Sequence, residues 1–79
     1  EEAAPYLLER AQARMNADQA RNAMLDYDAY YNAVNGKVND MFYYYREQAA
    51  LKAKQYQRAL DDMAKAIELN PEDLTYRQW

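Results

Sequence analysis

Side chains that could perform covalent or acid–base chemistry are few in this sequence. It contains no histidine and no cysteine, and the lone serine or threonine is Thr75. General acid–base catalysis would therefore have to come from carboxylates, lysines or tyrosines held in a cleft. Asp26 and Asp28 stand two residues apart, a spacing at which side chains on a helix face different ways. We therefore predict that the chain is not an enzyme and holds neither a metal nor a cofactor.

Tyrosine is the residue type best suited to recognition here. The chain has nine tyrosines, three of them in the run Met41-Phe42-Tyr43-Tyr44-Tyr45. Tyrosine combines a large apolar ring with a polar tip, which suits a binding surface. Successive residues on a helix differ by about 100°, so this run cannot share one face. We expect Phe42 and Tyr43 to pack inward, and the other three to lie on a second face.

The composition favours an all-α fold. The 79 residues form one domain at most. Strong helix formers dominate, whereas valine and isoleucine, which strands favour, together number three. The chain begins at Glu1 and ends at Trp79, inside what the pattern predicts to be an unfinished helix. We interpret it as a segment of a longer protein.

Charge and hydropathy argue against several classes of partner. The net charge is −3, and the ten basic residues are spread along the chain rather than concentrated on one face. Nucleic-acid binding needs a concentrated basic face, so we predict none. No apolar run approaches the roughly 18 residues that span a bilayer, which predicts no membrane insertion. The absence of cysteine excludes a disulfide framework, thiolate catalysis and cysteine-based zinc sites.

Apolar residues recur at helical spacing in four blocks. These blocks cover, approximately, residues 4–15, 19–34, 41–53 and 55–69. Pro71 disfavours helical geometry in the residue before it, so the fourth helix should stop at Asn70. Asp73 could cap a fifth helix over residues 74–79. The short connections predict antiparallel neighbours.

Residues between the blocks suggest how each helix begins and ends. Asp18 is the expected N-cap of the second helix, because its carboxylate can accept from free amides of the first turn. Asn35-Gly36 should end that helix, since glycine readily adopts the left-handed conformation. Asn39 or Asp40 can cap the third helix.

The chain resembles itself at an offset of 36 residues. In the second and fourth helices the superposed pairs are Ala23 on Ala59, Met24 on Leu60, Asp26 on Asp62, Tyr27 on Met63 and Tyr31 on Ile67. The first and third helices match more weakly, through Leu7 on Tyr43, Arg10 on Arg46 and Gln12 on Gln48. Two helical hairpins of nearly equal length are typical of a helical-repeat protein.

At this point the sequence resembles the tetratricopeptide repeat family, whose unit is a helical hairpin of about 34 residues. The second copy carries residues at the spacing of that family, namely Tyr43, Arg46, Glu47, Ala50, Ala59, Met63, Ala66 and Pro71. Its ending, AIELNPED, is the most typical part. The first copy departs from the pattern, with Tyr30 at a position where a small residue is usual and two extra residues around Asn35-Gly36. The resemblance divides the chain into repeat one at about 4–36, repeat two at about 40–71 and a truncated capping helix at 74–79.

The resemblance implies stacked hairpins in a short α–α superhelix, with the first helix of each hairpin lining a concave surface that binds peptides. The chain would then be a non-catalytic scaffold for a protein or peptide partner. The candidate partner-binding residues on that surface are Leu8, Gln12, Met15, Met41, Tyr44, Tyr45, Gln48, Leu51 and Lys52. Some family members grip a C-terminal carboxylate with Lys, Arg and Asn. Four of the groove positions here hold Leu8, Gln12, Met41 and Tyr45, so we expect no such clamp.

A second interpretation remains open, because an apolar surface can also be covered by other protein. The tyrosines could belong to the core, or the segment could be purely architectural within a larger protein. Two repeats are fewer than the three or so that repeat stacks usually need. We therefore also predict a homo-oligomer, formed through the open end of the stack near Trp79. Tyrosines in the second helices further resemble those of tetratricopeptide proteins from bacterial envelopes.

Four side chains are expected to pack in particular ways. Ala59 should let helices approach closely, because bulk at such a position disturbs packing. Glu47 replaces the usual small residue facing Ala59, so its carboxylate should escape to the edge of the hairpin. Tyr30 should hold the two hairpins apart. Arg46 should pack its stem while its guanidinium reaches a carboxylate, either Glu47 or Asp62.

Overall fold

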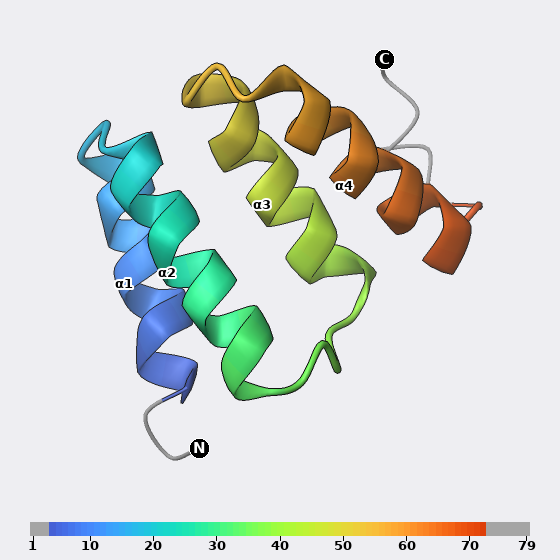
Figure 1. Ribbon diagram of the computed structural model, residues 1–79, viewed down its shortest axis with the longest axis horizontal. Coiled ribbons are helices and arrows are strands. Elements are labelled where there is room, and N and C mark those ends of the chain that lie inside the picture. Colours follow the sequence, from blue (N-terminus) through green and yellow to red (C-terminus); the bar gives the residue numbers. More distant parts are fainter. Residues whose placement is uncertain (1–3, 73–79) are drawn as a thin grey trace.

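The computed structural model describes residues 4–72, and four helices account for the regular structure in that range (Figure 1). They are α1 (Ala4–Asn16), α2 (Ala20–Ala33), α3 (Asp40–Lys52) and α4 (Tyr56–Leu69). The described part of the chain contains no strand, which confirms the predicted all-α class. The expected fifth helix and Trp79 lie outside the described residues.

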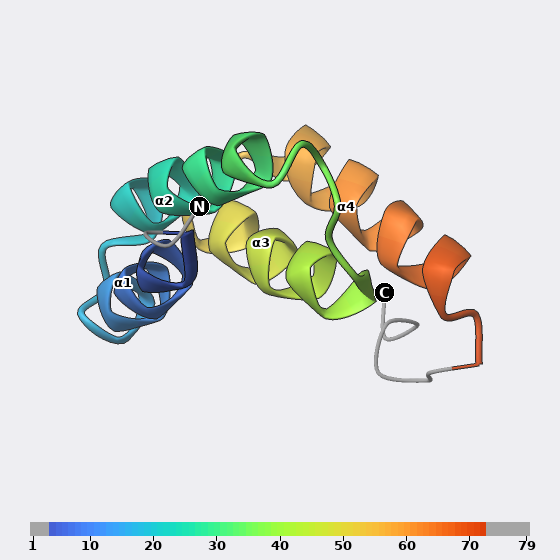
Figure 2. The same cartoon turned by 90° about the horizontal axis from the view of Figure 1, so that it is seen from below.

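The helices form two hairpins that pack side by side. α1 packs on α2, α3 packs on α4, and the hairpins meet mainly through α2 and α3. Seen from below, α1 and α3 lie on the inner side of a bend, with α2 and α4 behind them (Figure 2). This arrangement follows from the short links, which force each helix to run back along its predecessor.

Both hairpin turns are built in the same way, at positions 36 residues apart. Asp18 and Lys54 each adopt a left-handed conformation with φ of 63°. After α1 the amides of Asp18 and Gln19 donate to carbonyls of the last helical turn, and those of Lys54 and Gln55 do the same after α3. This pair of hydrogen bonds is the Schellman motif that closes a helix. The two turns therefore support the internal repeat.

The prediction that Asp18 caps α2 is wrong. Gln19 is the residue that precedes the helix, and it makes no side-chain capping bond. The physical reason is the length of the turn. Asp18 is already used to close α1, where its left-handed backbone turns the chain and its amide donates to the carbonyl of Met15 at 3.0 Å. Its carboxylate is therefore one residue too early to cap the next helix.

In the longer link between the hairpins, the predicted stop of α2 and the predicted N-cap of α3 are both confirmed. Asn35 and Gly36 both have positive φ, 56° and 74°, and they terminate α2. A Cβ at position 36 would lie 3.2 Å from the ring of Tyr31, so a larger residue would be crowded as well as strained. Asn39 then caps α3, its side-chain oxygen accepting from the amide of Phe42 at 3.0 Å. This cap fixes the direction of the first turn of α3.

The core combines close helix contacts with a cluster of aromatic rings. Eight buried alanines supply the close contacts; they are Ala11, Ala20, Ala23, Ala49, Ala50, Ala53, Ala59 and Ala66. At the joint between the hairpins, Phe42 lies among Tyr27, Tyr30, Tyr31 and Tyr43, with ring centroids 5.7 to 6.1 Å from its own. Offset and edge-on aromatic contacts at such distances are favourable. The α2–α3 joint is therefore aromatic, whereas each hairpin closes on alanine.

A bidentate arginine–aspartate pair joins the two helices of each hairpin; its arginine is exposed in the first hairpin and nearly buried in the second. Arg10 donates to both oxygens of Asp26 at 3.1 and 2.8 Å, and Arg46 donates to both oxygens of Asp62 at 2.9 and 3.0 Å. In both cases Nε and one terminal nitrogen make the two bonds, the geometry in which arginine binds a carboxylate most strongly. The predicted contact of Arg46 with Asp62 is confirmed.

Arg46 also joins the two hairpins. Its Nη1 donates to Asp28 of α2 at 3.2 Å, and Arg58 of α4 approaches the same carboxylate to 2.6 Å. The guanidinium carbon lies 5.0 Å from the ring centroid of Tyr31, a cation–π distance. Burial lowers the pKa of the guanidinium, but Asp62 and then Asp28 outweigh this and raise the pKa of Arg46 above its ordinary value. Arg46 is therefore positively charged at physiological pH.

The prediction for Glu47 is wrong. Its side chain does not escape to the edge; the residue has 0% exposure, and its Oε1 accepts from the side-chain amide of Gln48 at 2.8 Å. Tyr43 and Ala50, four residues before and three after, are both buried. Helical geometry puts all three on one face. Glu47 therefore lies at the centre of the packed face of α3, too far from either edge for its short side chain to reach solvent.

We predict that Asp62→Asn destabilises the protein by roughly 3 kcal/mol, because it removes the bidentate carboxylate from a buried guanidinium and leaves only the single bond to Asp28. The side chains of Arg46 and Asp62 are only 12% and 6% exposed. Urea denaturation measures the change. Asp61→Asn, at the exposed neighbouring position, is the control and should cost almost nothing. Equal free energies of unfolding for the two variants would contradict a dominant role for this pair.

Candidate functional site

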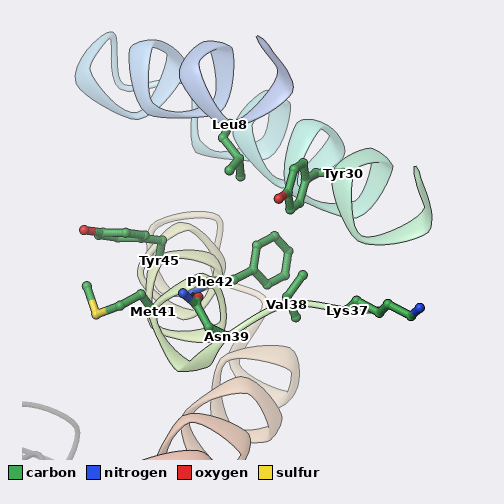
Figure 3. A pocket seen from close by; sticks show the side chains of 8 residues that line it. All are labelled: Leu8, Tyr30, Lys37, Val38, Asn39, Met41, Phe42 and Tyr45. Carbon is green, nitrogen blue, oxygen red and sulfur yellow. Dashed lines mark hydrogen bonds between the residues drawn. The ribbon is translucent and has the colours of Figure 1, made fainter. Parts of the chain in front are cut away.

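A pocket lies between the two hairpins, on the side where the link from α2 reaches α3 (Figure 3). Its volume is about 610 Å³, within the range of small-ligand and side-chain pockets. The lining residues are Leu8, Tyr30, Lys37, Val38, Asn39, Met41, Phe42 and Tyr45. They come from α1, α2, the connecting link and α3, so the pocket depends on how both hairpins are placed.

Local sequence explains why these side chains meet. The left-handed pair Asn35 and Gly36 turns the chain out of α2, so that Val38 passes over the end of the joint. The Asn39 cap then starts α3 beside that link, which directs Met41 and Tyr45, one turn apart, along the same side of the helix. Leu8 on α1 forms the opposite wall (Figure 3). Most of the lining is apolar or aromatic, and Lys37, Asn39 and the tyrosine hydroxyls supply its polar groups.

Tyr30 and Phe42 form the back of the pocket. Their rings are tilted by 30° with centroids 5.7 Å apart. Tyr30 occupies the position that corresponds to buried Ala66 in the second hairpin, and its ring lies between the hairpins as expected. That its bulk opens the angle between them stays a prediction.

Three of the sequence-predicted site residues line this pocket together. They are Leu8 from the first hairpin and Met41 and Tyr45 from the second. Tyr45 is 43% exposed and Met41 is 38% exposed, so both can contact a ligand. The structure therefore brings together one end of the predicted surface.

The other predicted residues lie outside this pocket. Met15, Tyr44 and Leu51 are partly buried against the core. The ring of Tyr44 lies 5.8 Å from that of Tyr45 and therefore flanks the pocket. Three polar residues complete the set: Gln12 is exposed and donates to Asn16, Gln48 donates to Glu47, and Lys52 lines a second pocket at the opposite end of the hairpins.

Five lining residues were not predicted as partner-binding. These are Tyr30, Lys37, Val38, Asn39 and Phe42. The two extra residues around Asn35-Gly36 were the available signal, since a lengthened link must lie somewhere on the surface. Phe42 was assigned to the packed face and is buried, yet it also closes the pocket floor. A helical-wheel argument assigns each residue to one face and misses such double roles.

The hydroxyl groups near the joint are held protonated. Burial raises the pKa of Tyr27 above its ordinary value of 10, and the nearby hydroxyl of Tyr45 adds to the shift. Burial also raises the pKa of Tyr43, with a further contribution from its contact with Tyr31. Both rings therefore present neutral hydroxyls at physiological pH, which suits packing rather than acid–base chemistry.

The pocket can enclose an apolar side chain and offer hydrogen bonds from the polar groups of its lining. Within residues 4–72, no group of three or more His, Cys, Asp or Glu side chains is placed to hold a metal ion. In the same part of the chain, none of the helices has the length and hydropathy needed to cross a membrane.

Comparison with known proteins gives no relative: no family model matches the sequence, and neither a curated protein nor a solved structure matches it. The tetratricopeptide resemblance therefore stays a prediction that rests on residue spacing.

We predict that stability falls as pH rises above about 10, where unfolded tyrosines ionise. Tyr27 and Tyr43 have raised pKa values in the fold, so above pH 10 the unfolded chain loses these protons more readily than the folded chain does. The free energy of unfolding is therefore unaffected by these groups below pH 10 and decreases as pH rises further. Thermal melting between pH 8 and 11 measures this loss. Tyr27→Phe should flatten the pH dependence, whereas Tyr56→Phe, at a 58% exposed position, should not. Equal slopes for the two variants would contradict the assignment.

Proposed function

We propose that this chain is a non-catalytic interaction scaffold of the tetratricopeptide type, which binds a segment of a partner protein on the side formed by α1 and α3. The single observation that carries the proposal is the pocket between the hairpins. It is lined by Leu8, Met41 and Tyr45, three of the residues that the tetratricopeptide resemblance assigns to the concave surface. A mostly apolar lining with a few polar groups is the usual character of a site that recognises one anchoring side chain.

The composition of the pocket favours a peptide over a small metabolite. Tyrosine and methionine are enriched where proteins bind one another, and Tyr30, Met41 and Tyr45 all line the space. The neighbouring surface of α3 continues through Tyr44 to Gln48, which can hydrogen-bond a peptide backbone. A bound segment would therefore place a bulky apolar residue in the pocket and run along α3.

We predict that random peptides displayed on phage and selected on this chain will share a bulky apolar residue. Tyr45→Ser should weaken their binding by about tenfold or more, as expected for an aromatic residue at the centre of an interface. Fluorescence polarisation of synthetic copies of the selected peptides measures the dissociation constants.

Tyr56→Ser is the matched control, because Tyr56 is a tyrosine on α4 with more exposed surface than Tyr45. It should leave peptide affinity unchanged. Melting followed by circular dichroism reports whether each variant is folded. Selected peptides that bind equally well to the Tyr45→Ser and wild-type chains would overturn the proposed site.

A second candidate function is architectural, and the exposed apolar side chains of α4 favour it. Tyr56, Leu60 and Leu69 are between 48% and 58% exposed. At the 36-residue offset, three residues of α4 correspond to residues on the side of α2 that meets α3. The pairs are Tyr56 with Ala20, Leu60 with Met24 and Ile67 with Tyr31. Within the described residues α4 packs mainly on α3 and reaches α2 through the Arg58–Asp28 ion pair, whereas α2 packs on both α1 and α3. Under this alternative, a further helix of the parent protein or of a second copy covers α4.

If copies of the chain associate through α4, Leu60→Glu should weaken association at least tenfold, because it places a charge in an apolar contact. Sedimentation velocity between 10 µM and 1 mM measures it. Leu25→Glu, at an exposed leucine of α2, is the control. A chain that remains monomeric throughout this range would contradict self-association, and the scaffold proposal would be unaffected.

A further inference from the structure

A second pocket is lined by residues of the α1–α2 and α3–α4 turns and the adjoining helix ends. Both turns lie at the end of the hairpins opposite the α2–α3 link (Figure 1). The volume of this pocket is about 470 Å³. It is lined by Asp18, Gln19, Ala20, Arg21, Asn22, Lys52, Ala53 and Lys54. Polar and charged side chains dominate this lining, in contrast to the apolar pocket around Tyr45. We refer to it as the basic pocket.

The basic pocket gathers cations that have no ion-pair partner. Within residues 4–72, the ion pairs use Arg10, Arg14, Arg46, Arg58 and Lys65. Four basic residues of that range take part in none of them; three, Arg21, Lys52 and Lys54, line the basic pocket, and the fourth, Lys37, lines the apolar one. With Asp18 included, the charge around the basic pocket is +2, although the whole chain carries −3.

Backbone amides also contribute positive charge to the basic pocket. The last carbonyls of α1 and α3 at this end already accept hydrogen bonds within the two turns. The first-turn amides of α2, by contrast, receive no side-chain cap from Gln19. Unpaired amides at a helix start carry partial positive charge. These amides at the start of α2 therefore add partial positive charge to that of the cationic side chains.

We propose that the basic pocket binds carboxylate side chains of the same partner segment whose apolar residue occupies the pocket around Tyr45. This inference rests on the proposed function and specifies its ligand as an acidic peptide segment. Lys52 connects the two sites, because it belongs to α3, the helix that also supplies Met41 and Tyr45. α3 therefore runs from the apolar pocket to the basic one.

Helix geometry sets the spacing that such a segment needs. Met41 and Lys52 stand eleven residues apart on α3, which corresponds to about 16 Å along the axis. An extended peptide covers about 3.3 Å per residue, so about five residues span this distance. The partner segment should carry a bulky apolar residue and, about five positions away, one or two aspartates or glutamates. A nucleic acid fits less well, since it would gain little from an apolar pocket.

The test uses two synthetic probes, Ac-LGSGSEE-NH2 and its neutral counterpart Ac-LGSGSQQ-NH2, with reversed-order versions of each. The full 79-residue chain is titrated with each probe and followed by ¹⁵N–¹H correlation spectra. The acidic probe should shift the amides of Arg21, Lys52 and Lys54 as well as those of Met41 and Tyr45. The neutral probe should shift only the second group and bind more weakly.

Charge-removing variants locate the contact. Arg21→Gln combined with Lys52→Gln should weaken binding of the acidic probe about three- to tenfold and leave the neutral probe unaffected. Lys65→Gln, an exposed cation of α4 outside both pockets, is the control and should change neither affinity. Raising the salt from 20 to 300 mM should weaken only the acidic probe, because exposed charges are screened.

Three outcomes would overturn the inference. These are equal affinity for the acidic and neutral probes, no shift at Arg21 and Lys52 with either, or saturation of the same amides by inorganic phosphate with an affinity equal to that of the acidic probe. The first two leave the proposed function intact if the amides of Met41 and Tyr45 still respond. Shifts confined to the basic pocket, unchanged when the leucine of the probe becomes alanine, support the carboxylate site and contradict the apolar one.

Discussion

The packing of this small protein depends on one buried cation, the guanidinium of Arg46. It binds Asp62 within its own hairpin and Asp28 in the other, and it lies over the ring of Tyr31. A buried charge is costly unless it is paired and hydrogen-bonded, so these carboxylates must stay where they are. α2, α3 and α4 are thereby held in one arrangement. Arg10 repeats the pairing with Asp26 but makes no such link between hairpins.

The surface features follow from that joint. Because α2 and α3 meet through the aromatic cluster around Phe42, the start of α3 stands away from α1, and the space between them is the apolar pocket. At the other end, residues of the two turns and the adjoining helix ends line the basic pocket, among them Arg21, Lys52 and Lys54. Within residues 4–72, the ion pairs near the joint use Asp26, Asp28 and Asp62, and none of them involves these three cations.

The two hairpins are alike internally but differ in the residues that they offer to a neighbouring helix. Asp28 of the first hairpin receives two arginines from the second, whereas the corresponding position of the second hairpin is Ala64, which offers no carboxylate. A further helix docking on α4 would meet Leu60 and Tyr56 instead of an acid. The two hairpins are therefore joined by charge and aromatic rings, and any additional neighbour of α4 must be held by apolar contact.

The sequence alone predicted the four helices, the Asn35-Gly36 stop and a carboxylate partner for Arg46, either Glu47 or Asp62. These depend on residues close in the chain or on a spacing that repeats, and local geometry suffices to predict them. Only the tertiary structure decided that Glu47 is buried and that Asp18 closes α1. It also decided that Leu8, Met41 and Tyr45 line one pocket, whereas Lys52 lines another. The use of Asp18 depends on the length of the turn, and the other features depend on where two helices cross, which a helical wheel does not contain.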